Sequence, residues 1–295
     1  MNIGLVTCES LAQYAAPNVD DEDSLLTRYL REQGHTVEPR VWTNPAVDWL
    51  RYDVVVVKSP WDYFDRVGEF YQWLDRMESL GVKLLNPAAT VRWNADKKYL
   101  LDMERAGVRI VPTHWLSRGQ AVETESLFDA LGHDTLVVKP AVSGGAKNTF
   151  VLTRQESSVR QPQLQELLRD EDFLVQPFQP QIQEEGEWSL IYFGGEFSHC
   201  VLKTPKSGDF RVQHYLGGGI EPREAPAHLR RAADAIVREF AADCLYARVD
   251  GLDQNGEFLL MELELIEPFL YLASSEGSLQ RYNAALRQLS NEIAK

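Results

Sequence analysis

The most informative stretch of the chain is Leu245–Pro268, with the sequence LYARVDGLDQNGEFLLMELELIEP. One strand-like run in it ends at Asp250, and the next one ends at Glu264. Side chains two positions apart in a strand point to the same face, so Glu262 and Glu264 project together. If the two strands pair, Asp250 joins them in a cluster of three carboxylates. Such a cluster requires a cation, and oxygen ligands without histidine or cysteine favour Mg²⁺ or Mn²⁺.

The alternative is that these acids lie on a solvated strand face, as is common in surface hairpins. The composition argues against this interpretation, because most neighbouring residues are apolar and buried acids need partners. These neighbours are Leu260, Met261, Leu263, Leu265 and Ile266. We therefore expect a metal site in this part of the chain.

A second stretch, Val137–Asn148, has the sequence VVKPAVSGGAKN and combines a strand, a lysine and a glycine-rich turn. Backbone N–H groups in such a turn form an anion-binding concavity, and Lys139 adds a positive charge for a phosphate. The pattern suits a nucleoside triphosphate, but the stretch lacks GxxxxGK[ST], and the first strand has no GxGxxG. Taken alone, Ser143-Gly144-Gly145 is better explained as an ordinary hairpin turn.

Residues 1–95 alternate strand-like runs with amphipathic helical stretches, which is typical of an open parallel α/β sheet. The expected strands are Ile3–Cys8, His35–Val41, Val54–Lys58 and Val82–Leu85, and the expected helices are Ser24–Gln33 and Phe70–Leu80. The acidic run Asp20–Asp23 is interpreted as a solvated helix start without chemistry of its own. The sequence thus predicts one amino-terminal α/β domain.

The pattern changes after Asn86-Pro87. Residues 96–175 predict a small α+β domain, with helices at Asp96–Gly107, Thr124–Leu131 and Gln161–Leu168 and strands at Val108–Val111, Thr135–Lys139 and Phe150–Thr153. Residues 176–295 predict a strand-rich third domain. Its further elements are strands at Trp188–Phe193, Glu196–Lys203 and Phe210–His214 and helices at Ala225–Asp243 and Ser278–Ile293.

The composition excludes several classes of protein. The chain has 295 residues, 44% of them hydrophobic, which is enough for two or three packed modules. Its net charge of −14 opposes binding to nucleic acid or to an anionic membrane. No spanning helix and no basic leader are found at the sequence level, so we expect a cytoplasmic protein. Cys8, Cys200 and Cys244 fit neither a disulfide framework nor a CxxC zinc site.

Taken in order with other motifs, the two stretches resemble the ATP-grasp ligases. The ordered set is Asn94-Ala95-Asp96-Lys97, the run from Ala106 to Thr113, the KP…SGG turn, a central glutamate, Arg248-Val249-Asp250 and Glu262-Leu263-Glu264. The resemblance covers about residues 1–290 and is more specific than any single motif. It implies an α/β and α+β fold, with an amino-terminal open α/β domain and ATP held between two α+β subdomains.

Position by position, the resemblance implies roles for residues of a nucleotide site. Lys97 and Lys139 would contact the phosphates under a flexible lid, Ser143-Gly144-Gly145. The remaining assignments are Gln176-Pro177-Phe178 for the adenine, Glu187 or alternatively Glu184 for the ribose, Asp250, Glu262 and Glu264 for Mg²⁺, and Arg248, Arg211 and Lys203 for the phosphoryl-transfer site. Two positions depart from the common pattern: Glu264 replaces an asparagine, and Gln176 stands where an acid is frequent.

The expected substrate contacts follow the strand Val54–Lys58, because open α/β sheets bind ligands outside the carboxyl ends of their strands. These residues are Trp61, Asp62 and Tyr63, with Cys8 and Glu9 in a similar place after the first strand. An acid between two aromatic rings suits a small ammonium group. Packing at a domain interface explains the aromatic residues equally well, and Asp62 could instead pair with Arg66.

In detail the chain looks most like the branch that contains the D-cycloserine synthetases (O-ureido-serine cyclo-ligases). The matching motifs are Lys58-Ser59-Pro60-Trp61-Asp62-Tyr63, Arg92-Trp93-Asn94-x-Asp96-Lys97 and Glu262-Leu263-Glu264-Leu265-Ile266-Glu267-Pro268. This implies a monomeric or homodimeric enzyme that uses ATP to activate the carboxylate of a small amino-acid-derived substrate as an acyl phosphate. A nitrogen of the same molecule then displaces the phosphate. The alternatives are an intermolecular carboxylate–amine ligase and a nucleotide-binding protein without turnover.

Overall fold

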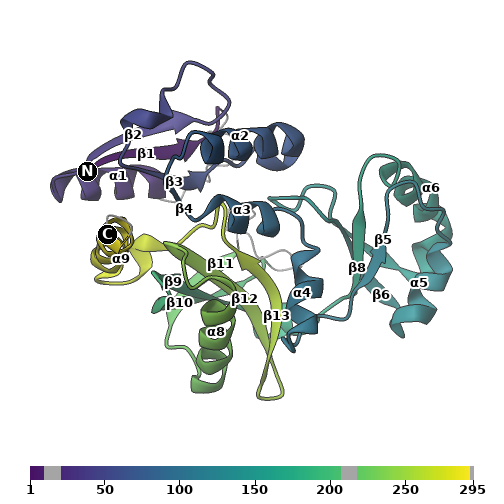
Figure 1. The fold of residues 1–295 in the computed structure, drawn as a ribbon. Coiled ribbons are helices and arrows are strands. Elements are labelled where there is room, and N and C mark those ends of the chain that lie inside the picture. Colours follow the sequence, from purple (N-terminus) through teal and green to yellow (C-terminus); the bar gives the residue numbers. More distant parts are fainter. Residues whose placement is uncertain (10–20, 207–217, 293–295) are drawn as a thin grey trace.

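The computed structural model describes residues 1–9, 21–206 and 218–292, and these form three sheets with helices packed against them (Figure 1). No helix within these ranges is long and apolar enough to cross a membrane.

The amino-terminal sheet is parallel, with the strand order β2-β1-β3-β4. Its strands are β1 (Asn2–Thr7), β2 (Thr36–Val41), β3 (Val54–Ser59) and β4 (Leu84–Leu85), and its helices include α1 (Glu22–Glu32) and α2 (Val67–Ser79). Every residue of β3 is buried, because the sheet is covered on both faces. The prediction of a parallel α/β sheet is confirmed.

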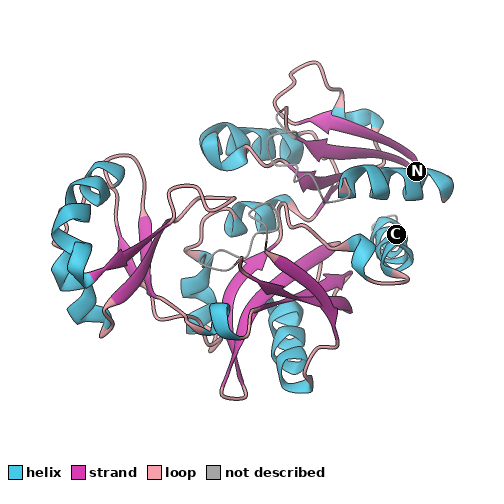
Figure 2. Ribbon diagram, turned by 180° about the vertical axis from the view of Figure 1, so that it is seen from behind, coloured by secondary structure: helices cyan, strands magenta, loops and turns pink. Residues whose placement is uncertain are grey.

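The middle sheet is antiparallel, with the order β5-β8-β6-β7. Its strands are β5 (His114–Leu116), β6 (Thr135–Pro140), β7 (Phe150–Thr153) and β8 (Phe173–Pro177). Helices α5 (Thr124–Leu131) and α6 (Ser157–Leu167) cover its outer face (Figure 2). Phe128, Leu136 and Val138 are among the buried residues that join these layers.

The third sheet is antiparallel, with the order β11-β10-β9-β12-β13. Its strands are β9 (Glu187–Phe193), β10 (Glu196–Thr204), β11 (Gly219–Arg223), β12 (Tyr246–Gln254) and β13 (Glu257–Glu264). Helices α8 (Ala227–Phe240) and α9 (Ser278–Glu292) pack against it. The register of β12 and β13 places Asp250 opposite Glu262 and Arg248 opposite Glu264, so the charged residues lie in two neighbouring cross-strand pairs.

Two buried asparagines fasten the third sheet to the chain that follows the first sheet. The Asn86 side chain donates to the carbonyls of Tyr246 and Leu265 at 2.9 and 2.8 Å. Asn94 donates to the carbonyl of Leu263 at 2.8 Å and accepts from the N–H of Leu265 at 2.9 Å. The strand ends that carry the acidic residues are therefore fixed relative to the amino-terminal sheet.

The expected strand Val108–Val111 is wrong, whereas the expected helix Asp96–Gly107 is present in shortened form as α4 (Tyr99–Arg105). The helix begins only at Tyr99 because the residues before it form a turn, in which the Lys97 N–H donates to the Ala141 carbonyl at 2.8 Å. A separate helix that was not expected, α3 (Ala88–Asn94), precedes this turn. The expected strand is reduced to one isolated bridge between Ile110 and Leu260. The short helix α7 (Gln181–Glu184) and strand β11 were not expected, and Phe210–His214 lies outside the described residues.

Candidate active site

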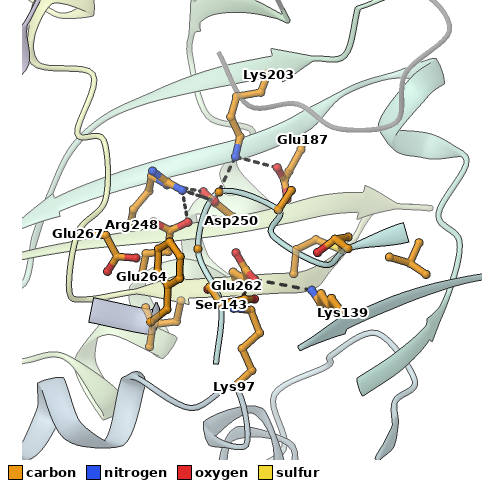
Figure 3. Close-up of a pocket in the computed structure, with 18 of the residues that line it drawn as sticks. Lys97, Lys139, Ser143, Glu187, Lys203, Arg248, Asp250, Glu262, Glu264 and Glu267 are labelled. Atoms are coloured by element: carbon orange, nitrogen blue, oxygen red, sulfur yellow. Dashed lines mark hydrogen bonds and ion pairs between the residues drawn. The ribbon is translucent and has the colours of Figure 1, made fainter. Parts of the chain in front are cut away.

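A cavity of about 280 Å³ lies where the three sheets meet. Its walls are formed by β6, β8, β9, β10, β12 and β13, the turn after β3, and the glycine-rich turn after β6. Most residues predicted for the nucleotide and metal sites line it: Lys97, Lys139, Ser143, Gly144, Gly145, Gln176, Pro177, Phe178, Glu187, Lys203, Arg248, Asp250, Glu262 and Glu264. Residues from distant parts of the sequence therefore share one pocket (Figure 3).

Two lysines approach Glu262 from different elements. The Nζ atoms of Lys97 and Lys139 lie 3.5 and 3.7 Å from Glu262 Oε1. Lys97 also donates to the carbonyl of Ser143 at 2.9 Å, which ties the glycine-rich turn to the same group. Burial lowers the pKa of Lys139, while Glu262 acts in the opposite direction. Two partly shielded ammonium groups at the end of a glycine-rich turn form a site suited to phosphate oxygens.

Asp250 lines the pocket and is paired with two cations. Arg248 Nη2 lies 2.9 Å and Lys203 Nζ 3.1 Å from Asp250 Oδ2, and Ser189 donates to Oδ1 at 2.6 Å. Burial alone would raise the pKa of Asp250, but Arg248 and Lys203 outweigh it and lower the pKa to about 2. Lys203 also pairs with Glu187 at 2.7 Å. These charges hold one another in a fixed arrangement within the third sheet (Figure 3).

The expected cluster of three carboxylates does not form. Arg248 pairs with both Asp250 and Glu264, and no group of three histidine, cysteine, aspartate or glutamate side chains in the described ranges is arranged to hold a metal ion. The physical reason is that each acid has a cation beside it: Arg248 pairs with Asp250 and Glu264, and two lysines lie within 4 Å of Glu262. Glu262 and Glu264 still line the pocket with oxygen donors, and burial raises the pKa of Glu264 to about 7. This donor set fits Mg²⁺, which commonly binds to one or two carboxylates together with substrate phosphates.

The predicted adenine residues and one of the two ribose candidates line the cavity. Gln176, Pro177 and Phe178 line the cavity at the end of β8, where the Gln176 side chain donates to Thr113 Oγ1 at 3.0 Å. Glu187 lines it at the start of β9, whereas Glu184 lies in α7 outside the lining. Arg211 lies outside the described residues.

The expected substrate residues are only partly brought together. Trp61 and Tyr63 line the cavity, but Asp62 does not, because its carboxylate accepts from the indole Nε1 of Trp42 at 2.7 Å. Arg66 pairs with Glu69 rather than with Asp62.

Cys8 and Glu9 are also absent from the lining. Cys8 is buried beneath the end of β1, and Glu9 accepts from Thr43 Oγ1 at 3.4 Å.

The lining residues that were missed from the sequence include Phe64, Glu267, Phe269 and Tyr271. Burial and the neighbouring Glu264 raise the pKa of Glu267 to about 8. An acid three residues beyond Glu264 in an apolar stretch was the available signal.

The acidic run at the start of α1 is also more than a solvated helix start. Glu22 is buried, and its carboxylate lies 2.9 Å from Lys58 Nζ, which is buried as well. A buried lysine needs such a partner, and this pair joins the start of α1 to the end of β3.

Comparison with known proteins agrees with this architecture. A family model described as the N-terminal domain of D-cycloserine synthetase DcsG matches residues 3–86. The cycloserine biosynthesis protein DcsG of Streptomyces lavendulae is 29% identical over 292 residues, covering 92% of this chain and 94% of that protein. A crystal structure of D-cycloserine synthetase DcsG superposes with a TM-score of 0.85 and 27% identity over 98% of this chain and 100% of the other. The chain therefore has the ATP-grasp fold and is similar to DcsG over nearly its whole length.

Other ATP-grasp ligases share the fold at lower sequence identity. The D-alanine–D-alanine ligase from Bacillus anthracis matches with a TM-score of 0.70 and 18% identity over 99% of this chain and 98% of the other. The similarity to DcsG extends over nearly all of both chains and indicates an ATP-dependent enzyme of the carboxylate–amine ligase type.

Proposed function

We propose that this ATP-grasp ligase activates the carboxylate of a small amino-acid-derived substrate and closes that molecule on its own nitrogen, as in D-cycloserine formation. The observation that carries the proposal is the similarity to DcsG over 92% of this chain and 94% of that protein. The pocket supports it because lysines, an arginine and carboxylates converge there. Positioned charges are what phosphoryl transfer requires.

The reaction proceeds in two balanced steps. A carboxylate oxygen attacks the γ-phosphorus of ATP, the bond to the bridging oxygen breaks, and ADP leaves with the electron pair. The nitrogen then attacks the acyl carbon, and phosphate leaves with the carboxylate oxygen that formed the first bond. The proton on nitrogen passes to solvent. A closed pocket prevents water from competing for the acyl phosphate.

We assign the phosphates to Lys97 and Lys139 and the covering lid to Ser143-Gly144-Gly145. Lys203 and Arg248 provide positive charge near the transferred phosphoryl group, with Asp250 fixing their positions at 3.1 and 2.9 Å. The end of β8, at Gln176-Pro177-Phe178, would hold the adenine, and Glu187 the ribose hydroxyls. Each residue lines the same cavity.

Glu262 and Glu264 would hold Mg²⁺ together with the ATP phosphates. The ion would neutralise the charge that develops on the transferred phosphoryl group. Asp250 is already bound to Arg248 and Lys203, so we assign it mainly to positioning these cations.

The experiment is to supply the protein with Mg-ATP and a panel of amino acids that includes O-ureido-serine, and to measure ADP release. We expect O-ureido-serine to stimulate release without any second amine. The second candidate is an intermolecular ligase, which the similarity to a glutathione synthetase of Prochlorococcus marinus favours, at 27% identity over 66% of this chain and 60% of that protein. In that case ADP release requires two different substrates.

A further inference from the structure

The segment that follows β13, residues 266–272, is held by side chains along its whole backbone. Every carbonyl from Ile266 to Leu270 accepts a hydrogen bond from a side chain. The donors, in chain order of the acceptors, are Tyr246 Oη at 2.7 Å, Trp61 Nε1 at 3.1 Å, Lys58 Nζ at 3.3 Å, Arg248 Nη1 at 3.0 Å and His199 Nε2 at 2.9 Å. An irregular segment tied at each carbonyl has a fixed backbone path.

The buried Glu22 carboxylate secures the same segment from the opposite side of the backbone. It accepts from the N–H groups of Leu270 and Leu272 at 2.9 and 3.1 Å. Since Glu22 also pairs with Lys58 at 2.9 Å, the start of α1, the end of β3 and segment 266–272 form one buried polar network. Burying these charges without partners would cost roughly several kcal/mol per charge. The contacts of this network are therefore what allows Glu22 and Lys58 to be buried here.

The fixed path determines which side chains face the cavity. Glu267, Phe269 and Tyr271 line it, while the intervening Leu270 and Leu272 are buried in the core. Alternate positions therefore point into the pocket, as in a strand. The segment presents one carboxylate and two aromatic rings to whatever binds there.

Among the described residues, Glu267 is the acid of the pocket that has no cation paired with it. Within the described ranges, no hydrogen bond or ion pair joins it to another side chain, whereas Asp250, Glu262 and Glu264 each have a cation within 4 Å. It lies beside Glu264 at the opposite side of the pocket from Lys139 (Figure 3). The indole N–H of Trp61 donates to the backbone carbonyl of Glu267. Burial and the nearby Glu267 carboxylate raise the pKa of the Tyr63 phenol.

We propose that Glu267 binds the ammonium group of the amino-acid substrate, with Trp61 and Tyr63 providing the adjacent walls. A carboxylate beside aromatic rings suits a primary ammonium ion, because charge pairing and ring faces both stabilise it. The assignment rests on the proposed function and makes it more specific: the substrate must carry a free amino group. It places the ammonium site at Glu267 rather than at Asp62, whose carboxylate is bound to Trp42.

The test compares wild type with Glu267→Gln on two compounds, the amino acid that stimulates ADP release and its analogue lacking the amino group. For the wild type, removing the amino group should raise KM about 10- to 100-fold, the range for a charge-assisted hydrogen bond. Glu267→Gln should raise KM for the amino acid by a similar factor and leave KM for ATP and the Mg²⁺ dependence unchanged. The variant should no longer distinguish the two compounds.

Control variants separate this role from others. Glu104→Gln, at an exposed position of α4, should behave as wild type. Glu267→Asp keeps the charge and should retain part of the preference for the amino acid. It also serves if Glu267→Gln fails to fold, which thermal unfolding would reveal.

Several results would overturn the inference. A shifted Mg²⁺ dependence would make Glu267 a metal ligand, and a lower kcat at unchanged KM would make it a proton acceptor. Equal discrimination by wild type and variant would exclude ammonium binding at Glu267 while leaving the proposed function intact. If no compound with an ammonium group stimulates ADP release or binds the wild type in calorimetry, both proposals are wrong.

Discussion

Gly144 in the glycine-rich turn packs directly against the ring of Phe64 in the turn after β3. A Cβ atom at Gly144 would lie 2.5 Å from Phe64 Cε1, closer than such atoms can approach. Lys147 of the same turn also pairs with Asp65. The glycine-rich turn is therefore in contact with the amino-terminal sheet as well as with Lys97, and its position depends on the absence of a side chain at Gly144.

Gly144→Ala should weaken ATP use through this contact. The φ angle of Gly144 is outside the left-handed region, so the backbone allows alanine there. The cost, about 1–3 kcal/mol, comes from overpacking when the glycine-rich turn lies against Phe64, so it falls on the position of this turn. We expect a KM for ATP at least about tenfold higher, with unchanged thermal stability of the core. Adding Phe64→Ala should relieve the clash and lower that KM again. A single variant with wild-type kinetics would show that the turn does not need this contact.

Lys139→Ala should weaken ATP binding by removing a charge-assisted contact worth about 1.5–3 kcal/mol. Isothermal titration with a non-hydrolysable ATP analogue measures the effect directly. Lys98→Ala is the matched control, because Lys98 is more exposed and pairs with Asp172 outside the pocket lining. An unchanged dissociation constant for Lys139→Ala would leave Lys139 without a role in phosphate binding.

Glu262→Gln should lower kcat by at least about 100-fold while the protein remains folded, since a carboxamide neutralises neither the metal nor the two lysines. Glu257→Gln is a suitable control: it lies on the same strand, but pairs with Arg109 on the exposed hairpin. Phosphate release near the wild-type rate at ordinary Mg²⁺ concentration would contradict the assignment of Glu262.

His199 makes stability depend on pH. Burial lowers the pKa of His199 from 6.5 to about 4, so the unfolded chain binds this proton more readily than the folded one. The contribution to stability is complete above pH 6.5 and is lost as the pH falls towards 4, by about 2 kcal/mol at pH 5.

His199→Gln should remove this part of the pH dependence, because an amide keeps a donor for the Leu270 carbonyl but does not titrate in this range. Chemical denaturation of both proteins at pH 7.5 and pH 5 provides the comparison. An equal loss of stability in wild type and variant would mean that His199 is not the group responsible.

Local sequence patterns predicted the strongly periodic elements well. Thr124–Leu131 and Phe150–Thr153 match α5 and β7 to the residue, because apolar spacing alone determines them. The helix expected at Asp96–Gly107 begins later, at Tyr99, because a hydrogen bond from the Lys97 N–H to the distant Ala141 carbonyl holds the preceding residues in a turn. Such a tertiary contact leaves no periodic signal.

The residues of the functional site were likewise predicted where local motifs mark them and missed where tertiary contacts place them. Lys139, Glu262 and the glycine-rich turn were predicted because each belongs to a short motif of neighbouring residues. Asp62 was assigned to the substrate, but in the folded chain its carboxylate accepts a hydrogen bond from Trp42. Glu267 was overlooked because only the fold of segment 266–272 shows that its side chain lines the cavity. Orientation after an irregular turn cannot be read from spacing.

Ring closure through an acyl phosphate is the central claim, and an isotope experiment tests it most directly. Each enantiomer of O-ureido-serine, with both carboxylate oxygens labelled with ¹⁸O, is incubated with the protein and Mg-ATP, and products are analysed by mass spectrometry. We predict that one enantiomer yields ADP, a cyclic product that retains one label in its carbonyl, and phosphate that carries the other label. The account is contradicted if the phosphate is unlabelled, or if neither enantiomer stimulates ADP formation while pairs of ordinary amino acids do.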